Sequence, residues 1–176
     1  LLGYISDMRQ QLGHSNEQFR AVVDIAEEFI YYRNIDGTYQ YVSPSCEKLT
    51  GYSAETFYEK PNFMDTVIYA SDLDIWTGHS PDINEQLESE TLDLRIITKT
   101  GETKWIKHVC ASVSDSNNKR KGVRASNIDI TEQKKHQDQI YNMAYYDPLT
   151  NLPNRRLFEQ NLEAMIEKSN GTDEVF

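Results

Sequence analysis

Alternating apolar and polar positions divide this chain into strand-like runs and helical stretches. Five runs combine β-branched and aromatic residues with the two-residue period of strands, and they lie at 28–34, 38–43, 91–98, 103–115 and 121–130. Asp36-Gly37 is typical of a hairpin turn between the first two runs. Turn residues also separate the last three runs, which therefore pair as antiparallel neighbours.

Helical spacing fills the stretches before and between these runs. Residues 1–14 carry one apolar stripe, and Ser15 with Gln18 is a capping signal for a second helix. Short helices are expected at 43–52 and 53–59, followed by a segment punctuated by Pro and Asn up to Trp76. This order predicts an α+β fold, a five-stranded antiparallel sheet with short helices on one face.

The alternation also predicts which strand positions share a face. Leu92, Leu94 and Ile96 lie on one face of their strand, with Asp93, Arg95 and Ile97 on the other. On the next strand, positions 106, 108 and 110 alternate with positions 105, 107 and 109. Alternation alone leaves open which of these two sets faces the core.

Three fragments resemble the PAS sensor family in the variant followed by a PAC segment. They are Asn34–Glu55, Lys99–His108 and Ser126–Lys134, of which Asp129-Ile130-Thr131 is the best single mark. The resemblance covers residues 15–131 and implies the PAS fold, with a ligand pocket between the sheet and the short helices. Candidate pocket walls, for most of which core packing is the alternative role, are Tyr41, Phe63, Trp76, Leu94, Ile96 and His108.

The local sequence does not favour a bound haem, flavin or zinc ion. Haem-binding PAS proteins hold iron through a His near the position of His79, but Gly78, Ser80 and Pro81 indicate a helix that is ending and a surface His. Cys46 lies in a context that does not match a flavin attachment site. The four histidines are dispersed and show no zinc-site spacing. We expect no metal or cofactor in this fragment, and a pocket that holds a small molecule or nothing.

Residues 132–146 have the spacing of a helix that Thr131 can cap. Gln133, His136, Ile140 and Met143 form a half-apolar seam, which on its own fits a solvated single helix. The family comparison favours a parallel two-helix linker, and hence a homodimer held by this helix and the N-terminal helix 1–14. The expected relay residues are Asp129, Thr131, Ile140 and Met143.

The segment from Asp147 to Arg156, followed by one apolar helix face, resembles the start of the GGDEF domain of diguanylate cyclases, which join two GTP into cyclic di-GMP. The residues that carry this resemblance are Asp147, Leu149, Thr150, Leu152, Pro153, Asn154, Arg155 and Arg156. The residues that bind Mg²⁺ and GTP in this family are absent from 147–176. We therefore expect a sensory module without enzyme activity that regulates a cyclase.

Several alternatives stay open for the output. One alternative is a ligand-free dimerisation relay in a protein whose GGDEF domain is degenerate or paired with a cyclic di-GMP phosphodiesterase domain. A histidine kinase output would place a phosphoacceptor His after the linker, where Asp147 to Arg156 stands instead.

The net charge and the cysteines of the chain indicate which classes of partner and which cellular compartment to expect. A net charge of −10 disfavours nucleic acid and anionic membranes, which attract positive surfaces. No run is apolar enough to span a bilayer, so we expect no membrane contact by the fragment. Cys46 and Cys110 lie in unlike contexts, which indicates a reduced, cytoplasmic chain without disulfides. Leu1 is not an initiator Met, so a membrane anchor upstream stays open.

Overall fold

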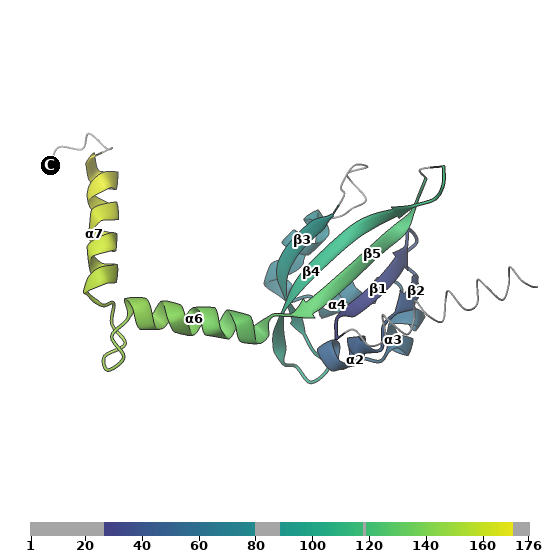
Figure 1. The fold of residues 1–176 in the computed structure, drawn as a ribbon, viewed down its shortest axis with the longest axis horizontal. Coiled ribbons are helices and arrows are strands. Elements are labelled where there is room, and N and C mark those ends of the chain that lie inside the picture. The colour runs from purple at the N-terminus through teal and green to yellow at the C-terminus, as the bar shows by residue number, and fades with distance from the viewer. Residues whose placement is uncertain (1–26, 80–88, 118, 171–176) are drawn as a thin grey trace, which may run out of the picture. The chain divides into compact units, whose positions relative to one another are not determined.

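The computed structural model describes residues 27–79, 89–117 and 119–170. Within these ranges the chain forms one antiparallel sheet in the order β2-β1-β5-β4-β3 (Figure 1). The strands are β1 (Phe29–Asn34), β2 (Tyr39–Val42), β3 (Glu90–Ile97), β4 (Thr103–Ser114) and β5 (Arg120–Asp129). The expected α+β fold with a five-stranded antiparallel sheet is confirmed. The last strand lies at the centre, where it pairs with both β1 and β4.

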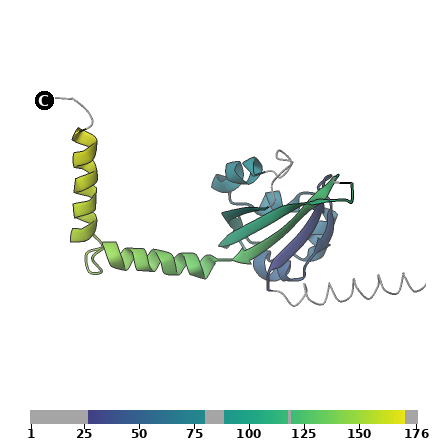
Figure 2. The ribbon, with the colours of Figure 1, turned by 45° about the horizontal axis from the view of Figure 1, so that its top comes forward.

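Five short helical elements connect β2 to β3 and lie on one side of the sheet (Figure 2). They are α2 (Ser45–Thr50), α3 (Ala54–Glu59), α4 (Phe63–Val67), the 3₁₀ turn η1 (Ala70–Asp72) and α5 (Leu73–Gly78). The first two match the helices predicted from the sequence, whereas the other three begin within the punctuated segment up to Trp76, and α5 continues to Gly78. The helices expected at 1–14 and after Ser15 lie outside the described residues.

One face of the sheet is buried against these helices. Leu94 and Ile96 are fully buried, whereas Ile97 is 39% exposed on the opposite face. On β4 the buried set is Ile106, His108 and Cys110, which resolves the alternative that the sequence left open. The inner face therefore carries polar as well as apolar side chains.

A buried carboxylate fixes the start of α5 against the sheet. Asp72 accepts hydrogen bonds from the backbone N–H of Arg95 at 2.8 Å and from its Nε at 3.0 Å. The hydrogen bonds from the Arg95 side chain hold the pKa of Asp72 below its usual value. Tyr69 N–H also donates to the Arg95 carbonyl at 2.9 Å. These contacts secure the segment that leads to Trp76 and His79.

The chain divides into two compact units, with the boundary between Thr131 and Glu132. The first contains the sheet and its helices. The second contains nearly all of α6 (Thr131–Tyr145), together with α7 (Arg155–Asn170).

Two neighbouring isoleucines on β3 test the inward alternation. We expect Ile96→Ala to lower the free energy of unfolding by about 2–5 kcal/mol, because it leaves a cavity in the core. Ile97→Ala should cost much less, because that side chain is already partly in water. Urea denaturation of the two variants measures the difference, and equal losses would contradict the assigned faces.

Candidate functional site

A cavity of about 270 Å³ lies between the inner face of the sheet and the segment that contains α4 and α5. Its walls combine aromatic, charged and amide side chains. They are Tyr31, Arg33, Ile35, Asn62, Asp65, Trp76, Thr77, His79, His108, Cys110 and Val123. This is the location that the resemblance predicted for a ligand pocket.

Two of the six predicted wall residues, Trp76 and His108, line this cavity. Phe63, Leu94 and Ile96 are buried in the hydrophobic core.

Tyr41 is placed differently from the sequence-based expectation. It pairs with Tyr32, one position from the buried Tyr31, so it lies on the outer face of the sheet. An irregularity in the β1–β2 pairing then turns Tyr39 inward, a local shift that strict alternation does not predict. Tyr39 is buried, and its hydroxyl oxygen accepts a hydrogen bond from Met64 N–H at 3.1 Å.

His108 on β4 is held by Asn127 on the neighbouring strand β5. The distance between His108 Nδ1 and Asn127 Oδ1 is 2.7 Å, and Asn127 Nδ2 donates to the Phe29 carbonyl at 3.1 Å. Because Asn127 Nδ2 is the amide nitrogen that donates to Phe29, the atom facing His108 is the amide oxygen Oδ1, which can only accept. His108 Nδ1 therefore carries the proton. The remaining nitrogen, Nε2, is then a lone-pair donor.

Burial favours the neutral form of this imidazole. Desolvation lowers the pKa of His108 to about 4, although the hydrogen bond to Asn127 acts in the opposite direction. His108 also packs edge-on against Trp76, with ring centroids 4.9 Å apart. At neutral pH the ring is therefore uncharged, with its orientation fixed from two sides.

His79 follows the last residue of α5 and is buried. The helix ends where Gly78 predicted, but the expected surface position of His79 is wrong, because the segment folds back onto the sheet. Its Nδ1 lies 3.1 Å from the Trp76 carbonyl oxygen, which can only accept, so this nitrogen carries the proton. Its Nε2 lies 3.1 Å from Cys110 Sγ.

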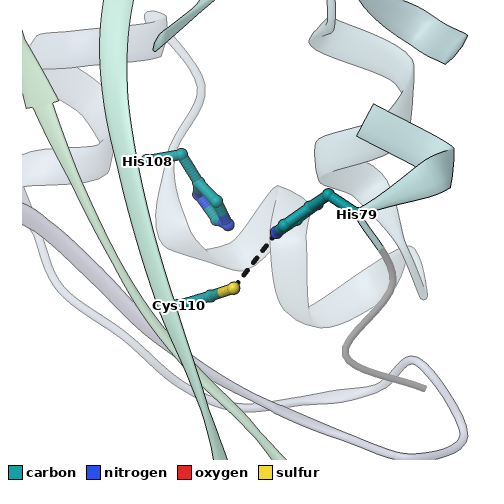
Figure 3. Close-up of side chains that lie close together, drawn as sticks. All are labelled: His79, His108 and Cys110. Carbon is teal, nitrogen blue, oxygen red and sulfur yellow. Dashed lines mark hydrogen bonds between the residues drawn. The ribbon is translucent and has the colours of Figure 1, made fainter. Parts of the chain in front are cut away.

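Cys110 is two residues from His108 on the inner face of β4. Burial raises the pKa of its thiol to about 11, with a further contribution from the charge of Glu90. The three side chains point toward one another, His79 from the end of α5 and the other two from β4 (Figure 3). One ligand atom from each lies within 4.8 Å of the others. Sequence spacing missed this cluster, because only the H-x-C pair on β4 is local.

The strongest sequence mark, Asp129-Ile130-Thr131, ties the start of α6 to the sheet. Thr131 N–H donates to Asp129 Oδ1 at 2.9 Å, and Trp105 N–H donates to Thr131 Oγ1 at 2.9 Å. Ile130 N–H donates to the Trp105 carbonyl at 2.9 Å. These bonds hold the first residue of α6 against β4.

Side-chain hydrogen bonds also organise the connection between α6 and α7. Asp147 Oδ1 accepts from the backbone N–H groups of Leu149 at 3.1 Å and Thr150 at 2.8 Å, and from the Thr150 hydroxyl at 2.9 Å. Asn154 Nδ2 donates to the Ala144 carbonyl at 2.9 Å, while its Oδ1 accepts from Leu157 N–H at 3.1 Å. Asn154 therefore caps α7 and binds the end of α6 at the same time.

The other residues of this segment complete the connection. Tyr146 and Pro153 pair as an isolated antiparallel β-bridge, and Asp147 N–H donates to the Leu152 carbonyl at 2.9 Å. Arg155 pairs with Glu159 one turn on, and the Arg156 guanidinium lies 5.3 Å from the centre of the Tyr145 ring.

The described fold and the sequence agree with one known family. The PAS fold family matches residues 39–127, which is half of the chain. The chain belongs to the PAS fold family. PAS domains are sensor modules of signalling proteins and are not themselves catalytic.

Solved PAS structures resemble this chain in fold. A PAS domain from Colwellia psychrerythraea is 23% identical with a TM-score of 0.59, and the match covers 66% of this chain and 97% of that one. The N-terminal domain of a diguanylate cyclase with a PAS/PAC sensor from Marinobacter aquaeolei is 18% identical with a TM-score of 0.55, covering 61% and 98%. A sensory box histidine kinase/response regulator from Burkholderia thailandensis is 20% identical with a TM-score of 0.51, covering 70% and 92%.

One curated relative matches locally. An uncharacterized protein of Synechocystis is 48% identical over 44 residues, which are 25% of this chain and 6% of the relative. The match thus spans a small part of that protein.

Among the described residues, no helix has the length and apolar character needed to cross a membrane.

The lowered pKa of His108 gives stability a specific pH dependence. Between pH 6.5 and about 4 the unfolded chain binds a proton at this residue that the folded PAS domain does not. The contribution is complete above pH 6.5 and is lost as the pH falls toward 4, by about 3 kcal/mol.

Two measurements check this expectation in chelator-treated protein. NMR titration of the histidine ring resonances, assigned with His108→Gln, should find His108 titrating near pH 4. In urea denaturation, the free energy of unfolding of His108→Gln should fall less on acidification than that of the wild type. A His108 resonance titrating near 6.5 would contradict the assignment.

Proposed function

We propose that this PAS domain is the sensory part of a bacterial signalling protein and controls a diguanylate cyclase through α6. In this proposal residues 15–131 form the sensor, 132–146 the signalling helix, and 147–176 the start of a GGDEF domain. The helix that the sequence predicts at residues 1–14 is proposed to assist dimerisation. The chain itself supplies no catalytic residue for cyclic di-GMP synthesis.

The connection between α6 and α7 carries this proposal. Asp147, Thr150 and Asn154, which carry the resemblance to the GGDEF domain start, make the hydrogen bonds that fold it. Asn154 in particular contacts both helices through one amide group. A hydrogen-bonded connector of this kind passes a rotation of α6 to the helix that follows, which a flexible linker does not.

The exposed face of α7 supports the same assignment. Phe158 is 62% exposed and Met165 69%, and Leu162 and Ile166 share the exposed apolar surface. An apolar face of this size on a helix is usually covered by other protein. In our proposal the remainder of the GGDEF domain packs against it.

The hydrogen bonds at Thr131 provide the input to α6. The first residue of this helix is bonded to Trp105 on β4, the strand that carries His108 and Cys110. A ligand that shifts β4 in the cavity therefore acts on the base of the helix. Within α6, Ile140 is 68% and Met143 82% exposed, as expected for a seam that pairs with a second copy.

Fold likeness alone does not decide the output, because the N-terminal domain of a diguanylate cyclase and a sensory box histidine kinase/response regulator both resemble this chain. The Asp147–Arg156 segment favours the cyclase. The sequence that follows Phe176 in the parent protein should contain a GG(D/E)EF hairpin, and a different domain there would overturn the proposal.

Insertions into α6 test whether its rotation carries the signal. One residue added after Gln139 turns the downstream helix by about 100°, whereas seven residues return it to within about 20° of its starting face. In the parent protein with its output domain, we expect the single insertion to uncouple or lock cyclic di-GMP synthesis. The seven-residue insertion should largely preserve regulation.

Product formation from GTP and Mg²⁺ is the measurement, with residues 1–176 as a control that forms no product. Cyclase output that is indifferent to both insertions would mean that α6 is a passive tether.

The seam of α6 gives a separate prediction for dimerisation. We expect the double substitution Ile140→Lys with Met143→Lys to weaken the dimer, because it places four like charges at the pairing surface. The thermal unfolding of the PAS domain should stay nearly unchanged, because both side chains are exposed. Sedimentation equilibrium measures the first effect, and Gln139→Lys with Asn142→Lys is the charge-matched control. Equal association of all three proteins would exclude this seam.

A further inference from the structure

We propose that His79, His108 and Cys110 bind a borderline-soft divalent transition-metal ion of the Zn²⁺ class inside the PAS cavity. One ligand atom from each residue lies within 4.8 Å of the others. We assign these atoms to Cys110 Sγ, to His79 Nε2, which lies 3.1 Å from that sulfur, and to His108 Nε2, because His108 Nδ1 is bonded to Asn127. All three residues are buried, and all three line the same cavity.

The distances fit a tetrahedral site after a small adjustment. Zinc bonds of about 2.0–2.1 Å to nitrogen and 2.3 Å to sulfur place neighbouring ligand atoms about 3.3–3.6 Å apart. His79 Nε2 and Cys110 Sγ are 3.1 Å apart without a metal. The other separations are at most 4.8 Å, so each must change by about 1.5 Å or less, and His79 can make such a movement because it lies at the end of a short helix.

The tautomers of both histidines are already those that a metal requires. Metal-bound histidines usually donate their other ring N–H to a carbonyl or carboxylate oxygen. His108 Nδ1 donates to the Asn127 amide oxygen at 2.7 Å, and His79 Nδ1 donates to the Trp76 carbonyl at 3.1 Å. Both Nε2 atoms are thus left with lone pairs that are free to bind a metal.

The protons balance in a simple way. Both imidazoles bind as neutral ligands through Nε2 and keep their Nδ1 protons, which are donated to Asn127 and to the Trp76 carbonyl, so neither ring has to lose a proton. The thiol proton of Cys110 is the one that the metal displaces; the S–H bond breaks, the proton passes to solvent, and a metal–sulfur bond forms. The site then holds a net charge of +1, and the Asp65 carboxylate lines the same cavity.

The ligand set indicates which ion binds and how. Two imidazoles and one thiolate favour zinc and similar transition metals over Mg²⁺ and Ca²⁺, which take oxygen ligands. Three protein ligands leave a fourth position, and the adjoining cavity of about 270 Å³ has room for water or a small ligand there. The ion would join the end of α5 to β4. Its role as the input signal rests on the proposed sensory function, whereas metal binding itself does not.

Cobalt substitution of the reduced 176-residue chain tests the site directly. One equivalent of Co²⁺ should give the visible bands of a tetrahedral complex and a near-ultraviolet thiolate-to-cobalt band, and Zn²⁺ should displace both. Competition with a chromophoric chelator should give a Zn²⁺ affinity at least about 100-fold weaker in Cys110→Ala and His79→Gln. This exceeds the usual cost of losing a residue that only hydrogen-bonds to a metal ligand. Mg²⁺ should neither compete nor raise the melting temperature.

Matched controls separate the site from other cysteines and histidines. Cys46→Ala removes the other buried cysteine, and His136→Gln removes an exposed histidine of α6. Both should keep the bands and the affinity, and circular dichroism should confirm that every variant is folded. His79→Gln lies outside the sheet, so it remains informative if Cys110→Ala does not fold. Absence of the thiolate band in the wild type, its persistence in Cys110→Ala, or its loss in Cys46→Ala would overturn the proposal.

Discussion

The hydrogen bond between His108 and Asn127 is the constraint on which the inner face of the sheet depends. Both side chains are fully buried, and burying either without a partner costs roughly 1–3 kcal/mol. The amide of Asn127 also reaches the Phe29 carbonyl, so this one pair joins β4, β5 and β1. A shift of either strand by one residue would turn its member of the pair to the outer face and separate the two groups.

The same pair determines the chemistry of the cavity. Asn127 accepts the Nδ1 proton of His108, so Nε2 keeps its lone pair. His108 lies in the same buried cluster as His79 and Cys110. The other end of the site depends on Asp72, whose bonds to Arg95 fix the start of α5 and hence the position of His79. Two buried polar contacts thus bring together three ligand atoms from separate parts of the sensor domain. The bonds at Thr131 connect the strand that carries two of them to α6.

Much of this could be predicted from local pattern. The strand positions, the turns and the end of α5 after Gly78 follow from side-chain period and backbone preference, which act over a few residues. The apolar face of α7 and the Asp147–Arg156 motif were equally visible. Tyr41 was misassigned because its pairing with Tyr32 places it on the outer face, whereas Tyr39 turns inward through a one-residue irregularity that depends on the partner strand.

The sequence by itself determined the fold class, the strand boundaries and the family, because these depend on periodicity and on motifs whose residues are near neighbours. Only the tertiary structure decided which face of β4 is buried, since that choice depends on what packs against it. It also brought His79 next to Cys110, 31 residues away along the chain, and gave both histidines their tautomers. Ligand geometry of this kind depends on long-range packing and on hydrogen-bond partners from other strands, and no local pattern of residues records either.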